Sequence, residues 1–478
     1  MHWFNKPINF SNLFGFIFIL SLVWTFAFGF SLAGSISMNL ITIIFIAIIG
    51  YKLLKFCNIT SIHISILKIC AISIVSIIFY LFLPSTYESL NTDSWYHFFS
   101  AYAHLLDPSV LKALTKFNFL GGTSINLLLQ IYSLLGIALI FFLYVAYVKY
   151  EKATLVIFLI AALTLIGVKH LLGLGEFSSP HPELRTLPLF LIGSLGISPM
   201  IFKSISLLPI AGFIYYCLMV FSNKTMLILI ICFSLLMPVI FFNIAMLEFS
   251  IWLFSFNTIM LLEFLRHRGE PIPQNNFRLL ALILILVCLI RQPAVFSFIP
   301  LLAYLIIHKQ FHEIRFLILC ALIPCIQLAH NLSVGNPALE SSIAPYVLLS
   351  SSLSFSALIP VVQNFSYLLF LAIFSIIPAK KYGSLTVILL CYLTGYWIAF
   401  HLIDPVVWGM PRYLIEYMAP LIIIGLVKLY AIIPKMTHVL IIIVLPFFLS
   451  EIRHNNSQIM ANASQEWFML DANSGARK

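Results

Sequence analysis

Charged residues are scarce in this sequence. Only 9% of its 478 residues are Asp, Glu, Lys or Arg, whereas 62% are hydrophobic, and the mean hydropathy is +1.07. A soluble domain carries far more charge, so the composition excludes one and predicts a polytopic membrane protein. The apolar runs are continuous and of helix-spanning length, which predicts an all-α fold, a transmembrane helical bundle.

The sequence also lacks the motifs of common cofactor-binding folds. It has no Walker loop, no Rossmann glycine pattern after a strand, no His and Cys at metal-ligand spacing, and no large soluble domain. Its cysteines lie in apolar runs or, for Cys57, in a loop expected in the cytoplasm, so none is placed for an external disulfide. The net charge of +10 is spread over many loops without a nucleic-acid patch. We therefore expect no cofactor, no metal and no nucleic-acid partner.

Apolar runs of roughly 17 to 25 residues predict about 13 to 15 membrane spans. They lie near residues 12–32, 36–54, 65–84, 127–148, 153–173, 199–221, 225–243, 247–265, 278–307 (a bent pair), 316–330, 362–379, 384–402, 413–432 and 436–450. We expect helices in the outer membrane interface in the loops near 84–126 and 174–198. The chain then divides into an N-terminal pair of spans (1–64), a transmembrane domain (65–450) and a polar C-terminal tail (451–478).

The loops between these spans differ in charge. When the helices alternate in direction, sixteen of the 26 Lys and Arg residues fall on one side, Lys224, Arg278 and Lys428 among them. Such an excess marks cytoplasmic loops, so we predict that this side, with the N-terminus, faces the cytoplasm. Most acidic residues fall on the outer side. The richness in Ile, Phe, Asn and Lys is typical of an AT-rich bacterial genome, and we expect a multi-pass protein of a bacterial inner membrane.

The loop over residues 84–126 is the long polar break between spans in the first part of the chain. It holds Asp93 close to Trp95, Tyr96 and His97. A carboxylate beside aromatic and imidazole side chains is suited to taking a proton from a hydroxyl and to binding a sugar face. The alternative is a solvated loop, with Trp95 and Tyr96 in the interfacial aromatic belt and Asp93 as a helix cap.

Four cations on the outer side lie within or beside predicted spans: Lys169, Lys203, Arg291 and Arg412. A cation at mid-membrane costs about 2.5 to 3.5 kcal/mol on insertion scales, so such residues usually face a polar cavity or an anion. For Lys169 and Lys203, snorkelling to the interface is an equal alternative. Arg291 precedes Pro293, which breaks its helix, and Arg412 follows another break, so we predict functional roles for these two arginines.

Several short motifs from residue 181 onward follow one another in a particular order. They are His181-Pro182-Glu183-Leu184, Leu236-Met237-Pro238, Glu248 at the start of a span, Arg291-Gln292-Pro293, and Arg412-Tyr413 with Pro420 downstream. In the order and sidedness of these motifs the chain, over about residues 84–430, resembles the GT-C superfamily of polytopic membrane glycosyltransferases. The resemblance is to enzymes that use dolichyl- or polyprenyl-phosphate sugars, of the mannosyltransferase and aminoarabinose transferase type.

The resemblance implies an inverting enzyme that transfers a sugar from a polyprenyl-phosphate-linked donor to a lipid, glycan or protein acceptor on the extracytoplasmic face. It implies that Asp93 is the catalytic residue. The substrate-binding residues that we predict are Trp95, Tyr96, His97, His181, Glu183, Arg185, Glu248, Arg291, Arg412 and Tyr413. Arginines are suited to the phosphate of the donor because the guanidinium binds phosphate oxygens in pairs.

The chain departs from the family pattern in the region of the first outer loop. Two extra spans precede the loop, a further hairpin (127–173) follows it, and Ser94 stands where the family has a second acid. These departures leave Glu176 and Glu183 as rival candidates for the catalytic acid.

Two other functions stay open. An O-antigen polymerase or ligase shares the lipid-linked donor and an outer catalytic loop, and depends on outer arginines more than on an acid. A transporter or lipid flippase also places charges inside a bundle and breaks helices near them. It predicts internal repeats of the span pattern, and the sequence has no convincing ones.

Overall fold

The computed structural model describes residues 201–245, 249–267, 270–333, 368–377, 383–401, 411–435, 437–440 and 442–450, together with Leu13, Val156 and Ile160. Nearly all of these residues are helical, and no β-strand occurs among them, so the described part of the chain is all-α, as the sequence predicts. The predicted outer interfacial helices, the N-terminal pair of spans and the polar tail lie outside the described residues.

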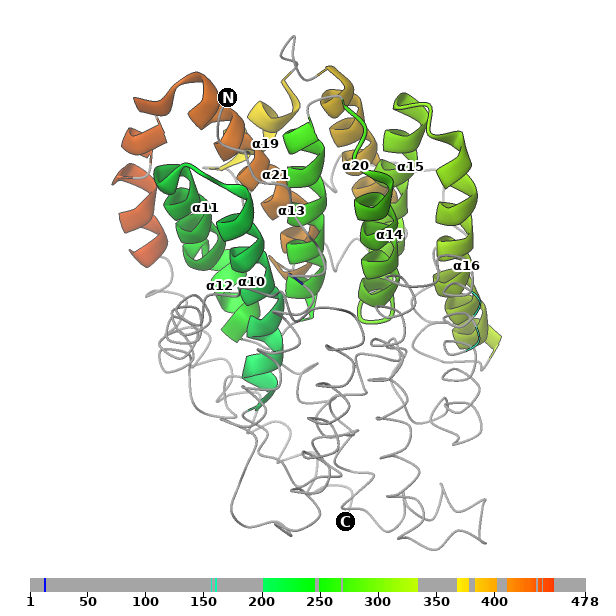
Figure 1. The fold of residues 1–478 in the computed structure, drawn as a ribbon. Coiled ribbons are helices and arrows are strands. Elements are labelled where there is room, and N and C mark those ends of the chain that lie inside the picture. The colour runs from blue at the N-terminus through cyan, green and yellow to red at the C-terminus, as the bar shows by residue number, and fades with distance from the viewer. Residues whose placement is uncertain are drawn as a thin grey trace, which may run out of the picture.

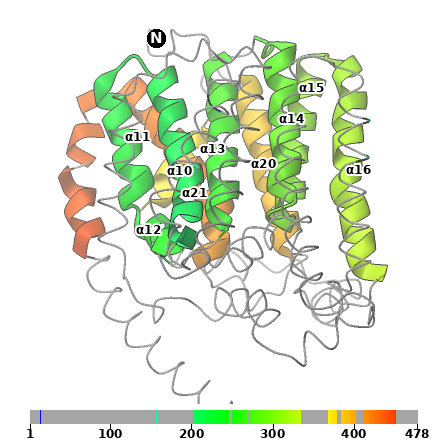
Figure 2. The same cartoon turned by 60° about the horizontal axis from the view of Figure 1, so that its bottom comes forward.

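Eleven elements make up this part of the fold, and Figure 1 labels its α-helices. They are α10 (Ile201–Val220), α11 (Lys224–Leu236), α12 (Pro238–Ala245), α13 (Ser250–His267), α14 (Gln274–Cys288), the 3₁₀ helix η4 (Gln292–Ser297), α15 (Phe298–Ile307), α16 (Phe311–Ser333), α19 (Leu369–Ile376), α20 (Gly383–His401) and α21 (Pro411–Ile432). The residues described between 434 and 450 are also helical. The helices stand side by side, with α10 and α11 toward one edge and α16 at the other (Figure 2).

Prolines decide where two of the predicted spans are interrupted. The run 225–243, predicted as one helix, is two: α11 ends at Leu236, and Pro238 begins α12. Met237 between them is extended in ψ (121°), because the residue before a proline is disfavoured in the α region. The run 278–307 is a broken pair, as predicted, with η4 between α14 and α15.

The described turns that carry predicted cytoplasmic cations lie at one end of the helices. The Asn223 side chain, which caps α11, donates to the Tyr430 hydroxyl near the end of α21 (3.2 Å). Tyr304 near the end of α15 stacks on Phe264 near the end of α13 (4.8 Å between ring centroids). We call this end of the helices the basic end and define it by Lys224, Arg266, Arg278, Lys309 and Lys435.

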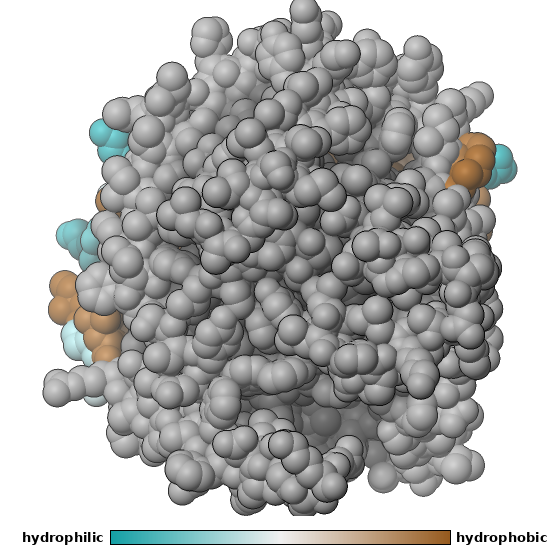
Figure 3. Space-filling model, turned by 90° about the horizontal axis from the view of Figure 1, so that it is seen from below, coloured by the Kyte–Doolittle hydropathy of each residue, from teal (hydrophilic) through white to brown (hydrophobic). Residues whose placement is uncertain are grey.

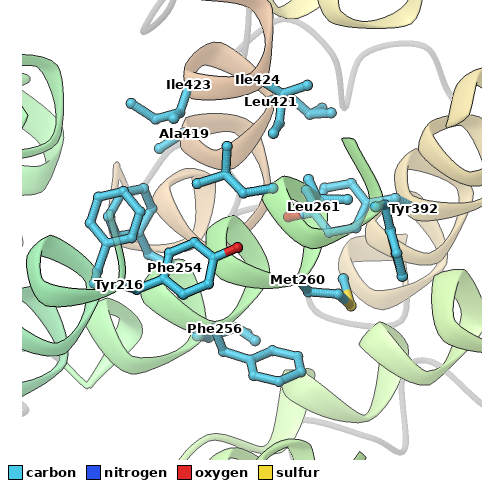
Figure 4. Close-up of a cluster of buried hydrophobic side chains, with 14 of the residues drawn as sticks. Tyr216, Phe254, Phe256, Met260, Leu261, Tyr392, Ala419, Leu421, Ile423 and Ile424 are labelled. Atoms are coloured by element: carbon cyan, nitrogen blue, oxygen red, sulfur yellow. The ribbon is translucent and has the colours of Figure 1, made fainter. Parts of the chain in front are cut away.

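Helix α21 forms the centre of the hydrophobic core. Its residues from Ile415 to Leu429 are all buried, and α13 and α19 pack closely against it. Figure 4 shows Leu421 and Ile424 of α21 facing the same cluster as Phe254 and Leu261 of α13. A helix that is apolar on all sides is expected to be covered on all sides.

The contact between α19 and α21 depends on a glycine and a lysine. A Cβ added at Gly425 would overlap the carbonyl of Leu371, so the two backbones approach too closely for any side chain there. One turn later, the buried Lys428 donates to the carbonyls of Ser375 (2.5 Å) and Ile377 (2.9 Å) at the end of α19. Helix C-termini present unpaired carbonyls that favour a cation. The prediction of Lys428 as a loop cation was therefore wrong: it lies inside α21 and caps α19.

Candidate functional site

Arg291 occupies the break between α14 and η4. Helix α14 ends at Cys288, Arg291 is extended (φ −141°, ψ 110°), and η4 begins at the next residue with Pro293 in its first turn. Its backbone is anchored on both sides, since its N–H donates to Val287 (2.7 Å) and its carbonyl accepts from Ala294 (3.1 Å). The 15 residues of α14 span about 22 Å, so this break is far from the basic end.

The Arg291 guanidinium is paired with a carboxylate inside the protein. Its Nε donates to Oε1 of Glu416, which lies near the start of α21, and the two side chains are only 9% and 0% exposed. Each buried charge would be very unfavourable without the other, because removing one partner of such a pair costs about 3 to 5 kcal/mol. The pair therefore fixes α21 against the α14–η4 break.

A second proline explains the hydrogen bonds around Glu416. Pro420 lies four residues further along α21 and has no N–H, so the Glu416 carbonyl lacks its usual helical donor. Two side chains supply donors instead: Nδ2 of Asn257 on α13 (2.7 Å) and the hydroxyl of Tyr392 on α20 (3.1 Å). The hydroxyl of Ser297 in turn donates to Oδ1 of Asn257 (2.8 Å). Two helices, α13 and α20, thus donate to one carbonyl, and Ser297 of η4 holds the amide of α13 in place.

Tyrosine rings close the cluster on the side of α20. The hydroxyl of Tyr417, the residue after Glu416, donates to the carbonyl of Pro293 in η4 (2.7 Å). Its ring lies against Tyr396 (4.9 Å) and Tyr392 (5.4 Å) of α20. Together these residues place a charged pair, an amide and several hydroxyls in a buried site between α13, η4, α20 and α21. Such a site is able to bind an anionic group on the arginine and to hold or move a proton on the carboxylate.

Two further buried carboxylates lie at the basic end. Glu263 accepts from the Tyr216 hydroxyl (2.6 Å) and pairs with Arg266 (3.1 Å). Glu313 at the start of α16 forms a two-pronged pair with Arg278 of α14 (2.9 Å for both bonds). Burial raises the pKa of the Glu313 carboxyl, but the hydrogen bonds from Arg278 and other donors lower it more, so the pKa lies below its usual value. The Tyr216–Glu263 hydrogen bond joins α10 to α13, and the Arg278–Glu313 pair joins α14 to α16, so we assign both carboxylates a structural role.

Only three of the predicted site residues lie within the described part of the chain. Arg291 is buried at a helix break, in agreement with its sequence context. Arg412 and Tyr413 lie in the first turn of α21, and Arg412 is four positions before Glu416, on the same face of the helix. The remaining predicted residues lie outside the described part of the chain: Asp93, Trp95, Tyr96, His97, His181, Glu183, Arg185 and Glu248.

Apart from Arg291, the members of the buried cluster are absent from the predicted set: Glu416, Asn257, Tyr392, Ser297, Tyr396 and Tyr417. One sequence signal points to the first of them, since Glu416 stands four residues before Pro420, where a helical carbonyl loses its donor. Asn257 is the one amide within the apolar helix α13. A polar residue buried inside an apolar helix is a reason to look for a partner.

No metal centre is evident among the residues that the structure describes, because no three His, Cys, Asp or Glu residues there are grouped to hold an ion. In the same residues one helical segment, Ile415–Ile432, is long and apolar enough to cross a membrane, and several shorter apolar helices accompany it. No protein-family model matches the chain, and no curated protein or solved structure is similar to it.

Proposed function

We propose that the chain is a polytopic membrane glycosyltransferase of the GT-C type, located in a bacterial inner membrane with its site toward the extracytoplasmic face. The donor is a sugar linked to polyprenyl phosphate, and the acceptor is a hydroxyl of a lipid, a glycan or a protein. In the reaction the acceptor oxygen bonds to the anomeric carbon, its proton passes to Asp93, and the bond from that carbon to the phosphate oxygen breaks. The lipid phosphate departs with the bonding electrons.

The distribution of side chains supports a membrane location. Helix α16 exposes Ile318 and Leu322, and α20 exposes Val387 and Leu390, while α20 buries the hydroxyl-bearing Tyr392. Figure 3 shows small groups of apolar residues at two opposite edges of the molecule, with hydrophilic residues beside them. Exposed apolar faces around a charged interior are unfavourable in water but suit helices surrounded by lipid.

The observation that carries the proposal is the buried Arg291 at the helix break. The departing phosphate develops negative charge, and a guanidinium held in a water-poor site stabilises such charge more strongly than one in water. The break follows from Pro293, and the backbone of Arg291 is fixed on both sides, so the cation is positioned before the substrate arrives. Arg412, one turn before Glu416 on α21, is a second candidate for the same phosphate.

One observation favours a second candidate function. A buried arginine and carboxylate at two proline positions is also the arrangement expected of a transporter or flippase, in which broken helices carry the substrate-binding charges. An O-antigen polymerase or ligase would use the same arginine on its lipid-linked donor. The transporter differs from both enzymes in one measurable respect, since it forms no glycosidic bond.

The test is transfer of sugar from a radiolabelled polyprenyl-phosphate-sugar pool in membranes that carry the full chain. Asp93→Asn keeps the shape of the side chain and removes the base, and we expect it to reduce transfer at least 100-fold, in line with general-base catalysis. Asp107→Asn, in the same loop, is the matched control and is expected to retain transfer. Full transfer by Asp93→Asn would exclude Asp93 and move the search to Glu176, Glu183 and Glu248.

Membranes with the wild-type chain also separate the classes of function. Labelled product that depends on Asp93, or on Glu176, Glu183 or Glu248 in its place, supports the glycosyltransferase. Product that depends on Arg291 but on none of these acids supports the polymerase or ligase. Movement of the intact labelled lipid across the membrane, without any new glycosidic bond, would support the transporter instead.

A further inference from the structure

The buried cation of the proposed phosphate site already has an anion beside it. Arg291 pairs with Glu416 inside the protein, and both side chains are removed from solvent. A phosphate that approaches the guanidinium therefore meets a carboxylate in the place where it would bind. We infer that Glu416 is an internal counter-anion for Arg291, which a lipid-linked phosphate displaces when it binds and which returns to the arginine when the phosphate leaves.

The backbone of Glu416 is held independently of its carboxylate. Asn257 and Tyr392 donate to its carbonyl, and Ser297 holds Asn257. The carboxylate reaches Arg291 through the side chain alone. Rotation about the side-chain bonds of Glu416 is thus able to break the ion pair without moving α21.

Arg291 remains in place when its partner changes. Its N–H and carbonyl are both bonded within the α14–η4 turn, and Tyr417 holds that turn to α21 through the Pro293 carbonyl (2.7 Å). An arginine in this position needs an anion at all times, because a buried charge left alone is strongly unfavourable. Exchange between a carboxylate and a phosphate meets that need of the arginine at every stage, and the displaced Glu416 carboxylate becomes neutral by binding a proton from the solvent.

The exchange has a consequence for the two forms of the lipid. This step rests on the proposed function, in which the bound donor is a phosphodiester and the product is a phosphomonoester. The diester carries one negative charge, whereas a monoester carries about 1.5 to 2 near neutral pH. Arg291 alone would hold the product more tightly than the donor, and competition from Glu416 opposes that retention. Glu416 is therefore a positioning residue that promotes release of the lipid phosphate.

The experiment measures equilibrium binding of radiolabelled dodecyl phosphate, an alkyl phosphomonoester, to the purified full chain in detergent micelles. Glu416→Gln keeps the size of the side chain and removes the competing anion, and we expect binding to tighten about tenfold. Glu416→Asp keeps the charge but shortens the reach, and we expect a smaller gain in the same direction. Glu313→Gln removes the carboxylate of another Arg–Glu pair and is expected to leave binding unchanged.

Arginine variants establish where the probe binds. The double variant Arg291→Gln/Glu416→Gln carries no buried charge at this position, so we expect it to fold. Because it lacks the guanidinium, we expect it to bind the probe weakly and to lose the gain that Glu416→Gln produces alone. Weaker or unchanged binding in both folded Glu416 variants would overturn the inference. So would a gain that persists in the double variant.

Different experimental outcomes would reject Glu416 as a counter-anion and reject the chain as a glycosyltransferase. Tighter binding in Glu416→Gln without any sugar transfer by the wild type would keep the counter-anion and reject the glycosyltransferase. Asp93-dependent transfer by a chain whose Glu416→Gln variant binds the probe no more tightly would keep the enzyme and reject the counter-anion. In an active enzyme, Glu416→Gln is further expected to be more sensitive than the wild type to inhibition by dodecyl phosphate.

Discussion

The substitution Asn257→Leu tests how the carbonyl freed by Pro420 is stabilised. Asn257 donates to the Glu416 carbonyl (2.7 Å) and accepts from Ser297 (2.8 Å), and it is fully buried. Leucine has the same number and branching of side-chain heavy atoms, with bulkier methyl groups in place of the amide, so the shape of the side chain is largely kept while both hydrogen bonds are lost. The effect of the change therefore reports on the polar contacts of this one side chain.

The expected loss follows from what remains bonded. Tyr392 still donates to the Glu416 carbonyl (3.1 Å) in the variant, so the carbonyl loses the shorter of two donors. The Ser297 hydroxyl loses the acceptor that Asn257 gave it. Leaving a buried polar group unsatisfied costs about 1 to 3 kcal/mol, so we expect Asn257→Leu to lower the free energy of unfolding by about 2 to 3 kcal/mol.

The double variant isolates the part that comes from the carbonyl. In Pro420→Ala the new N–H is able to donate to the Glu416 carbonyl along the helix, so Asn257 is no longer needed there. We expect Asn257→Leu to cost about 1 kcal/mol less in the Pro420→Ala background than in the wild type, which is the coupling energy of the pair.

The assay is unfolding of the purified chain in mixed micelles with increasing sodium dodecyl sulfate, followed by far-ultraviolet circular dichroism. The wild type, both single variants and the double variant are measured together. Thr394→Val is a matched control, because Thr394 is exposed and its hydroxyl bonds only within its own helix (2.9 Å to Leu390). Equal losses from Asn257→Leu in the two backgrounds would refute the link between Pro420 and Asn257.

Three further predictions concern contacts between helices. Gly425→Ala forces α19 away from α21 because its methyl group would overlap the Leu371 carbonyl, and we expect a loss of several kcal/mol in the same unfolding assay, whereas Gly383→Ala meets no atom within 4 Å and should have little effect. Lys428→Met removes the cap of α19 and is expected to lower the free energy of unfolding by about 2 kcal/mol; an unchanged value would argue against capping. Glu313→Gln should destabilise the chain by about 2 kcal/mol near neutral pH. Because the pKa of Glu313 is lowered on folding, the difference in free energy of unfolding between wild type and variant is complete above the ordinary carboxyl pKa of 4.5 and declines as the pH falls below it. A difference that does not depend on pH would refute the ion pair as its cause.

Local features of the structure could be predicted from the sequence. The apolar runs predict the helices from α10 onward to within a few residues at most ends, and Pro293 predicts the break at Arg291. These features depend on backbone chemistry within one or two turns, so a single stretch of sequence contains the needed information. The prediction of one span over 225–243 is wrong for a local reason as well, because Pro238 ends one helix and begins the next.

The partners of the buried polar groups could not be predicted in this way. Arg291 and Glu416 are 125 positions apart, and Asn257 and Glu416 are 159 apart. Lys428 shows the same limit, because its place at the end of α19 depends on how closely α19 approaches Gly425. Nothing in the intervening residues specifies which helices pack together.

The sequence by itself determined that the chain is helical and apolar, where its helices break, and that a cation stands at one of the breaks. Each of these depends on composition or on proline, whose effect extends over about one helical turn. The tertiary structure alone decided that the cation faces Glu416, and that Asn257 and Tyr392 replace the donor missing at Pro420. Those choices follow from the packing of α13, α20 and α21 around one buried site, because a buried charge or carbonyl must find its partner on whichever helix lies beside it.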